Sequence, residues 1–524
     1  MWVFFLLVFH STSALFPGRP PDEGDIRHLY PICSIAIGLI DHAHVLPYLL
    51  GSLENLDYPK SRIHLELHLL GKEDTTREQV LWWKSSVADL FASVNVVQDA
   101  ENWEETALRN ARLKKSSKVL ITTGNNLIRN EKILQDLSSE KEHVIVTALM
   151  GSAGHEEPVN IDEVPEGEET RKEIFSAYFP MLIQLSEMDS SYLTFDSQNL
   201  PNFKGSDEPL DVFYESARRM GVKIYLDSGH YHGVYFSDLL DLPQQRRLLR
   251  YHLCDLIADD TSLPTYSRTV RSWTPDPELW NVDRIYLINL KRRPDRLKRM
   301  TKIFEVLGID YTLLEASDGR NLPSNLKITL IAGYEDPITK RPLTTGEIGC
   351  FLSHYRIWKE VVSQKLKRVI VFEDDLRFSL DGMERVKEVL EDLDSSRRDW
   401  DLIYLGRKKM DIEEDQWIPL HRHLSTVGYS YWTLGYLLSQ SGAEKLLAPK
   451  PLDRLVPVDE YLPIMFDRHP KVNWMTHFPT RNLDAYTLYP LVVFPQKYTH
   501  EAGYVTDTEN SSFYTVPASS KDEL

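Results

Sequence analysis

Short apolar runs alternate along the N-terminal half of the chain with stretches whose apolar residues recur at helical spacing. The runs predict buried strands, and the stretches between them predict helices. The expected strands are residues 32–40, 65–70, 118–121, 144–147 and 222–226, and the expected helices are 45–56, 78–92 and 209–220. Because strands and helices alternate, we expect an α/β domain with a mostly parallel sheet.

The same alternation starts again near residue 283. Expected strands follow at 284–290, 311–315, 368–372 and 402–405, and expected helices at 296–307, 346–362 and 383–393. We therefore predict two α/β domains in tandem, at residues 30–262 and 283–500, joined by a proline-containing linker at 263–282. Residues 501–524 are polar and are expected to form a tail.

The composition excludes several classes of protein. A chain of 524 residues with 42% hydrophobic and 26% charged residues is typical of packed globular domains. Lysine and arginine number 60 against 78 acidic residues, so the formal charge of −18 argues against nucleic-acid binding. Three cysteines are too few for a disulfide scaffold, and their pairing stays open.

The N-terminal residues predict export into the secretory pathway. Trp2–Phe9 is an unbroken apolar run, too short to span a bilayer. Thr12 and Ala14 then stand three residues and one residue before a cleavage site after Ala14. This pattern predicts a signal peptide at residues 1–14, although it lacks the usual positive charges. A buried N-terminal strand is the alternative.

The C-terminal residues predict where the exported protein stays. The chain ends in a signal for retrieval to the endoplasmic reticulum lumen, which the KDEL receptor reads: Lys521, Asp522, Glu523 and Leu524. No later segment reaches 18 apolar residues, so no membrane span is expected. Asn510 heads the sequon Asn510-Ser511-Ser512 in the polar tail and is the expected glycosylation site.

A run of acids after a buried strand is the most informative motif. The apolar strand ending at Phe372 leads directly into Glu373, Asp374 and Asp375. Ligands bind beyond the carboxyl ends of strands in open α/β sheets, and adjacent carboxylates need a cation or basic groups nearby. Glu373 and Asp375 are two residues apart and would share one hard cation, Mn²⁺ or Mg²⁺. Asp374 is either a further ligand or a hydrogen-bonding partner, and a solvated acidic turn is the alternative.

Polar residues after other strands predict a site for a nucleotide diphosphate. The first strand of the second domain ends in candidate phosphate-binding residues: Asn289, Lys291, Arg292, Arg293 and Arg296. Asp318 follows the next strand and is a candidate ligand of a ribose or a base. His354 is a candidate nucleotide contact, with a satisfied core histidine as the favoured alternative. The alternative for the basic run is a solvated helix start.

Together these segments resemble glycosyltransferase family 25, and especially its procollagen galactosyltransferases. The resemblance is carried, in consistent order, by residues 285–300, 345–358, 369–378, 400–406, 457–470 and 503–508. It implies a Rossmann-like domain of the GT-A type, with Mn²⁺ and UDP-galactose. It also implies transfer of β-galactose to 5-hydroxylysine of a collagen-like polypeptide.

The N-terminal domain resembles the first glycosyltransferase domain of that family, for example at Leu46–Pro59. It departs from the family pattern where a strand should lead into two acids. Thr123 and Asn125 stand at those two positions, and neutral groups do not offset the charge of a divalent ion. We expect this domain to be a degenerate, metal-free GT-A-like domain.

Transfer from a UDP-α-sugar to a β-glycoside inverts the anomeric carbon, and so needs a base for the acceptor hydroxyl. Asp459 and Glu460, in a segment that resembles the family, are the candidates. The alternative for this pair is two acids stabilised by a helix N-terminus. The competing hypothesis for the whole chain is an inactive family member that acts as an adhesion or binding protein. Whether the chain forms a homodimer is open.

Overall fold

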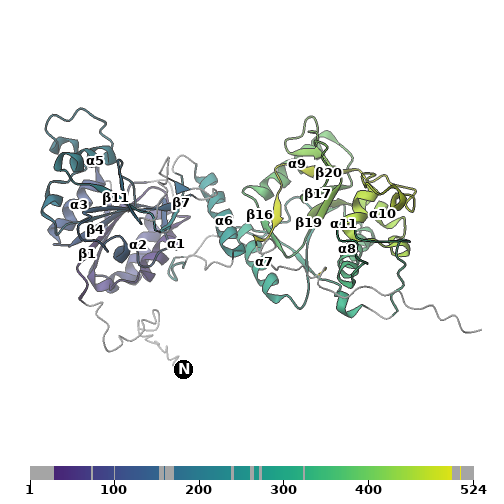
Figure 1. The fold of residues 1–524 in the computed structure, drawn as a ribbon. Coiled ribbons are helices and arrows are strands. Elements are labelled where there is room, and N and C mark those ends of the chain that lie inside the picture. The colour runs from purple at the N-terminus through teal and green to yellow at the C-terminus, as the bar shows by residue number, and fades with distance from the viewer. Residues whose placement is uncertain are drawn as a thin grey trace, which may run out of the picture. The chain divides into compact units, whose positions relative to one another are not determined.

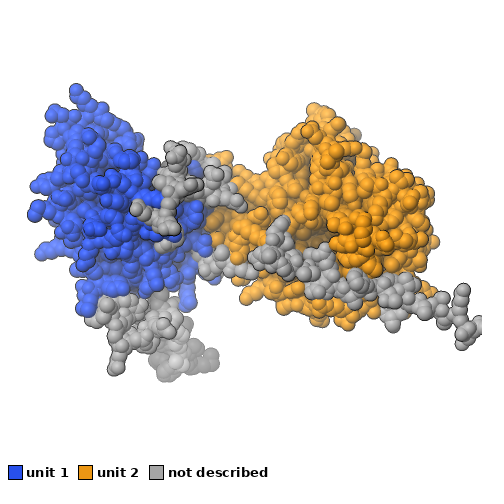
Figure 2. Space-filling view, viewed as in Figure 1, with its two compact units in different colours: residues 1–238, 264–272 blue, residues 239–263, 273–524 orange. Residues whose placement is uncertain are grey.

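The computed structural model describes residues 29–71, 75–98, 101–152, 158–159, 170–229, 231–237, 241–259, 265–270, 274–322, 325–497 and 508. The signal peptide at 1–14, the Asn510 sequon and the C-terminal tetrapeptide lie outside these residues. The chain divides into unit 1, residues 1–238 and 264–272, and unit 2, residues 239–263 and 273–524 (Figure 2). Each unit is a sheet flanked by helices (Figure 1).

Unit 1 is built on a sheet with the strand order β3-β2-β1-β4-β10-β6-β11-β9. The strands are β1 (Cys33–Leu39), β2 (Ile63–Leu69), β3 (Ser93–Gln98), β4 (Lys118–Thr123), β6 (Ile145–Ala148), β9 (Arg171–Ile174), β10 (Met181–Gln184) and β11 (Ile224–Asp227). The helices are α1 (Leu46–Asn55), α2 (Thr76–Val87), α3 (Trp103–Leu113), α4 (Ile133–Asp136) and α5 (Pro209–Met220). A small second sheet is made of β5 (Asn126–Ile128), β7 (Met150–Ser152), β8 (Pro158–Val159) and β12 (Gly233–Tyr235).

Unit 2 is built on a sheet with the order β14-β13-β15-β19-β17-β20-β18. The strands are β13 (Arg284–Asn289), β14 (Thr312–Glu315), β15 (Arg368–Phe372), β17 (Leu402–Lys409), β18 (Leu424–Thr426), β19 (Ser430–Ser439) and β20 (Ala485–Leu488). The short strands β16 (Leu376–Phe378) and β21 (Val493–Pro495) pair separately. The helices are α6 (Leu242–Ala258), α7 (Pro294–Leu307), α8 (Thr345–Gln364), α9 (Gly382–Ser396), α10 (Gln440–Leu447), α11 (Val458–Met465) and α12 (Val472–Met475).

The two sheets repeat one topology. In unit 1, β10 lies antiparallel between β4 and β6, and β6 pairs in parallel with β11. In unit 2, β19 lies antiparallel between β15 and β17, and β17 pairs in parallel with β20. Strand β4 therefore corresponds to β15, and the residues at their carboxyl ends, Thr123–Asn125 and Glu373–Asp375, occupy equivalent positions.

The fold confirms two α/β units in tandem with parallel strands in each sheet, and it differs from the expectation by additional antiparallel strands. Four described strands of the two main sheets that the sequence pattern did not predict, β9, β10, β18 and β19, pair antiparallel to their neighbours. Both sheets are consequently mixed, with parallel strands at β1–β4 and at β13–β15. The sites expected beyond the parallel strands are unaffected by this difference.

The observed units also differ from the expected boundaries. Helix α6 falls in the expected N-terminal domain but packs in unit 2, where the Tyr251 hydroxyl donates to Glu384 Oε2 at 2.5 Å. Residues 264–272, expected to be linker, belong to unit 1, where the Ser267 N–H donates to the carbonyl of Pro47 at 2.7 Å. The chain therefore crosses between the units more than once.

Strand β15 is buried on both faces, and this burial places the acids that follow it. Val369 and Val371 pack into one apolar cluster of unit 2, while Ile370 and Phe372 pack into the other. All four side chains have no exposed surface. Shifting this strand by one residue would exchange its two buried faces, so its register is tightly specified. The apolar run ends at Phe372, and Glu373 is the first residue beyond the carboxyl end of the strand.

Candidate active site

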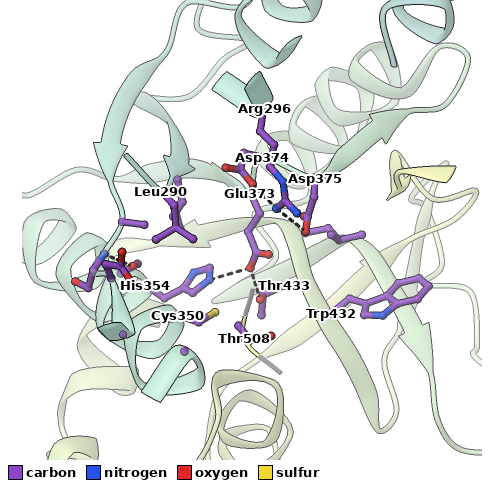
Figure 3. A pocket seen from close by; sticks show the side chains of 18 of the residues that line it. Leu290, Arg296, Cys350, His354, Glu373, Asp374, Asp375, Trp432, Thr433 and Thr508 are labelled. Atoms are coloured by element: carbon purple, nitrogen blue, oxygen red, sulfur yellow. Dashed lines mark hydrogen bonds and ion pairs between the residues drawn. The ribbon is translucent and has the colours of Figure 1, made fainter. Parts of the chain in front are cut away.

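A cavity of about 450 Å³ opens beyond the carboxyl ends of β13 and β15 (Figure 3). Its titratable lining residues are Arg292, Arg296, Asp318, Arg320, Cys350, His354, Glu373, Asp374, Asp375, Lys408 and Asp459. They come from sequence positions more than 160 residues apart, and the sheet brings them together. The predicted acids after β15 and the predicted base Asp459 therefore face one cavity.

Asp374 points toward the basic segment after β13. It accepts from Asn289 Nδ2 at 2.6 Å and lies 3.1 Å from Arg296 Nη1. Asn289 also donates to the carbonyl of Arg293 at 3.1 Å, so this carboxylate ties the β13–α7 turn to the end of β15. The contacts fit the alternative in which Asp374 is a hydrogen-bonding partner.

Glu373 has one oxygen held and one oxygen unused. Its Oε1 accepts from Thr433 Oγ1 at 2.5 Å and lies 3.1 Å from His354 Nε2 (Figure 3). Burial alone would raise the pKa of Glu373. The hydrogen bond and the charge interaction with His354, and then the hydrogen bond from Thr433, outweigh burial and lower this pKa overall. The carboxylate is therefore ionised at neutral pH.

Of the three acids, Asp375 has the fewest hydrogen bonds and ion pairs to stabilise its negative charge. Arg296 Nη1 lies 3.4 Å from its Oδ2, while its buried Oδ1 has no hydrogen-bond partner among the described residues. Burial, followed by the charges of Glu373 and Asp374, raises the pKa of Asp375 to about 7. A buried carboxylate oxygen without a partner is costly unless a ligand satisfies it.

This donor set fits a hard divalent cation. Both acids line the cavity, where Glu373 accepts its printed hydrogen bonds only on Oε1 and Asp375 Oδ1 has no partner among the described residues. Oxygen ligands of this kind suit Mg²⁺ or Mn²⁺. A cation there would stabilise the ionised form of Asp375, which burial and the charges of Glu373 and Asp374 now disfavour. Arg296 alone does not do so, because it is shared with Asp374.

The predicted phosphate-binding residues separate into two groups. Arg292 and Arg296 line the cavity, and Arg292 Nε lies 3.3 Å from Oδ2 of Asp318, which lines it too. Lys291 and Arg293 do not belong to the lining, and the Lys291 side chain is 83% exposed. Asn289 is buried behind Asp374 and supports the site from outside the cavity.

Asp459 is half-buried in the cavity wall at the start of α11. Its Oδ1 has no hydrogen-bond partner among the described residues. Burial, then the charges of Glu373, Glu460 and Glu347, raise the pKa of Asp459 to about 8, and the backbone N–H of Trp432 partly offsets the rise. Trp432 has a left-handed φ of 74°, a strained conformation for an aromatic residue, and it lines the cavity as well.

Glu460, the other candidate base, is not brought into the cavity. Its oxygens accept from the hydroxyls of Tyr429 at 2.9 Å and Tyr431 at 2.7 Å, and His469 Nε2 lies 2.7 Å away. The side chain is 3% exposed. Glu460 therefore ties α11 to β19 and has no free oxygen for an acceptor.

Several residues that line the cavity were not predicted as site residues, among them Thr433, Lys408, Arg320 and Cys350. Thr433 and Trp432 lie on β19, whose position beside β15 cannot be read from local periodicity. Two of the others follow directly from predicted features. Arg320 is two residues beyond Asp318, and Cys350 is one helical turn before His354, a spacing that places both side chains on one face of α8.

The equivalent position in unit 1 is filled by its own side chains. His42 Nε2 lies 2.6 Å from Asn125 Oδ1, and a Cβ at Gly124 would meet the His42 ring at 2.6 Å. Asn126 Nδ2 donates to Thr123 Oγ1 at 2.9 Å. The two neutral residues that replace the acids are thus engaged inside unit 1.

Comparison with known proteins defines the class of this chain. The model of glycosyltransferase family 25 matches residues 282–462, and the model of that family's N-terminal domain matches residues 30–106. A family 25 member from Anopheles gambiae is 32% identical, with 97% of this chain and 93% of that protein aligned. Homo sapiens procollagen galactosyltransferase 2 is also 32% identical, with 92% of this chain and 84% of that protein aligned.

A Bos taurus protein described as "Probable inactive glycosyltransferase 25 family member 3" is equally similar, at 32% identity over 94% of this chain and 90% of its own. Among solved structures, TarS of S. aureus in complex with UDP aligns over 43% of this chain and 65% of its own, at 17% identity and a TM-score of 0.28. That structural likeness is too low to carry an argument. The sequence comparisons place the chain among the glycosyltransferases. It belongs to glycosyltransferase family 25.

Proposed function

We propose that unit 2 transfers galactose from UDP-galactose to 5-hydroxylysine of a collagen-like polypeptide, with inversion at the anomeric carbon. The observation that carries the proposal is the cavity in which Glu373, Asp375 and Asp459 gather beyond the carboxyl ends of the sheet. Relatives of the chain include named procollagen galactosyltransferases, which supports the donor and the acceptor.

Glu373 and Asp375 would hold Mn²⁺ or Mg²⁺. When bound, such a cation neutralises charge on the diphosphate leaving group. The residues of the chain itself complete the electrostatic environment. Arg292, Arg320 and Lys408 line the same cavity and offer cations to the phosphate oxygens.

Asp459 serves as the base in this proposal. Its carboxylate takes the proton of the acceptor hydroxyl while the new C–O bond forms, and the bond between the sugar and UDP breaks. The raised pKa of Asp459 makes the ionised form a stronger base than an exposed aspartate. Its free Oδ1 leaves a position for the acceptor hydroxyl.

A transfer assay tests this function. The full-length protein is incubated with UDP-[¹⁴C]galactose, Mn²⁺ and a collagen peptide that contains hydroxylysine, and a lysine peptide of the same sequence is the control. Galactosyl-hydroxylysine formed only with the first peptide supports the proposal. No product, together with no UDP binding, removes it and leaves the inactive binding protein as the account.

One observation in unit 1 supports the second candidate function, an inactive binding protein. In unit 1, His42, Gly124 and Asn125 fill the position equivalent to the acids, so one of the two glycosyltransferase folds is metal-free in this account. We propose that unit 1 stabilises the protein or binds acceptor, and that the protein works in the endoplasmic reticulum lumen. No helix in the described part of the chain is long and apolar enough to cross a membrane.

A further inference from the structure

A chain of hydrogen bonds runs through the core of unit 2 to Glu373. Trp358 Nε1 donates to the Tyr436 hydroxyl at 3.2 Å, that hydroxyl lies 2.9 Å from His354 Nδ1, and His354 Nε2 lies 3.1 Å from Glu373 Oε1. Trp358 and Tyr436 are fully buried, and His354 is 1% exposed. Solvent therefore does not supply alternative partners to the inner members.

Trp358, at the buried end of this series of hydrogen bonds, determines which atom donates in each of them. An indole N–H is only a donor, so the Tyr436 oxygen accepts from Trp358 and has its own hydrogen to give. Burial raises the pKa of Tyr436 far above its ordinary value, so the hydroxyl keeps that hydrogen. The acceptor for it is His354 Nδ1, which leaves the ring hydrogen on Nε2, directed at Glu373 Oε1.

The opposite tautomer is disfavoured at both ends. With the hydrogen on Nδ1, the Nε2 lone pair would face the ionised Glu373 carboxylate, and the Tyr436 hydroxyl would lose its acceptor. A doubly protonated ring would also keep a hydrogen on Nε2. In each favourable arrangement Nε2 has no lone pair for a metal.

We infer that Tyr436 and His354 are positioning residues: their hydrogen bonds fix Glu373 Oε1 and turn Oε2 toward the cavity, where it is free to bind a divalent cation. Thr433 supports the same oxygen from β19, so Oε1 has two donors. Oε2 accepts no hydrogen bond from the described residues. The inference rests on the proposed function, because the cation is the one assigned there.

The structure also offers a competing arrangement. Ligand atoms of Cys350, His354 and Glu373 all lie within 4.8 Å of one another, a combination that suits a thiophilic metal such as Zn²⁺. In that arrangement His354 would be a ligand through Nε2. The hydrogen-bond chain argues against it, and the test separates the two.

The first experiment measures Mn²⁺ binding by electron paramagnetic resonance in full-length protein with saturating UDP. Partners of metal ligands are typically worth about 10–100-fold in metal affinity. We expect Tyr436→Phe to weaken Mn²⁺ binding at least about tenfold. Tyr404→Phe is the matched control, because Tyr404 pairs with Tyr436 on the adjacent strand, is equally buried and stands outside the hydrogen-bond chain.

Two further variants keep the test independent of folding defects. His354→Gln retains an N–H donor and should bind Mn²⁺ more tightly than His354→Leu, with thermal unfolding recorded for both. Equal Mn²⁺ affinity in Tyr436→Phe and Tyr404→Phe, or in both His354 variants, would overturn the positioning role. If wild-type protein binds no Mn²⁺, the proposed function fails and this inference fails with it.

A second experiment needs only wild-type protein and Cys350→Ser. Co²⁺ is added in place of Mn²⁺, and the near-ultraviolet and visible spectra are recorded. The inference predicts an octahedral oxygen-type spectrum that Cys350→Ser does not change. An intense thiolate-to-cobalt band that disappears in Cys350→Ser would make Cys350 and His354 ligands and contradict the assigned tautomer.

Discussion

Asp459 and Glu460 are neighbours in the sequence with opposite surroundings. Asp459 faces the cavity with an oxygen that has no partner in the part of the chain that the structure describes, whereas two tyrosines and a histidine bind the carboxylate of Glu460. Consecutive residues of a helix point about 100° apart, so only one of the pair can face the site. The choice between them could not be made from the sequence, because both are acids in the first turn of the same helix.

For Asp459→Asn we predict loss of transfer together with a gain in stability. The pKa of Asp459 is raised from 3.8 to about 8, so the native state binds a proton more tightly than the unfolded state. Wild-type stability is therefore lost as the pH rises between these values. The variant should match wild type in Tm at pH 4 and exceed it at pH 8 by roughly 2–4 °C, equivalent to about 1 kcal/mol. Scanning calorimetry at both pH values, without metal, checks this. Equal Tm values at pH 8 would contradict the assigned burial of charge.

For Glu460→Gln the opposite outcome is expected. An amide in place of the carboxylate loses charge-assisted hydrogen bonds from Tyr429, Tyr431 and His469, at a cost of about 1–3 kcal/mol in the free energy of unfolding. Transfer by the folded variant should persist. Urea unfolding followed by tryptophan fluorescence measures the first effect, and the galactose-transfer assay measures the second. Complete loss of transfer in a well-folded Glu460→Gln protein would return Glu460 to the list of candidate bases.

Among the elements, the ends of β15 and β4 decide which unit binds a cation in the proposed function. Asp375 and Asn125 occupy equivalent positions after these strands. Asp375 has a buried carboxylate oxygen with no partner among the described residues, whereas Asn125 Oδ1 lies 2.6 Å from His42 Nε2. Asp375→Ala should reduce Mn²⁺-dependent transfer by about 10²–10³-fold, in line with the loss of a group that stabilises developing charge. Asn125→Ala, the matched change in unit 1, should leave transfer within about twofold. Both rates come from the peptide assay, and comparable activity in the two variants would remove the assignment.

The sequence predicted some elements of the site well and others not at all. β15 is recognisable because four apolar residues stand directly before three acids, and the turn after β13 is recognisable by its cluster of basic residues. β19 is not, because it carries small and polar residues such as Thr433 and Gly435 between its apolar ones, and its antiparallel partners are distant in sequence. The hydrogen bonds through Tyr436 depend on the position of β19, so they could not be predicted from the sequence either.

The assignment of α6 was missed for a related reason. The helix precedes a segment that returns to unit 1, so linear order suggested that it belonged to the first domain. Its buried residues Tyr251 and Cys254 pack into an apolar cluster of unit 2. The boundary between the two units at α6 depends on tertiary contacts, and the local sequence pattern carries no information about such contacts.

At the scale of the whole molecule, the proposed location is testable independently of catalysis. Residues 521–524 match the signal read by the KDEL receptor. Expression of the chain without these residues in cultured cells should move protein from the cell fraction to the medium, while the full-length chain stays inside. Immunoblots of both fractions measure this. Equal retention of the two forms would show that the tetrapeptide does not determine location.

In the proposed function, the acids after β15 hold a divalent cation under the diphosphate of a nucleotide, and unit 1 holds none. Isothermal titration calorimetry of UDP into the full-length protein tests both parts at once. We predict binding heat with Mn²⁺ present, a stoichiometry of one UDP per chain, and no measurable heat with EDTA or in Asp375→Ala. Metal-independent binding, or a second site that survives Asp375→Ala, would contradict the account.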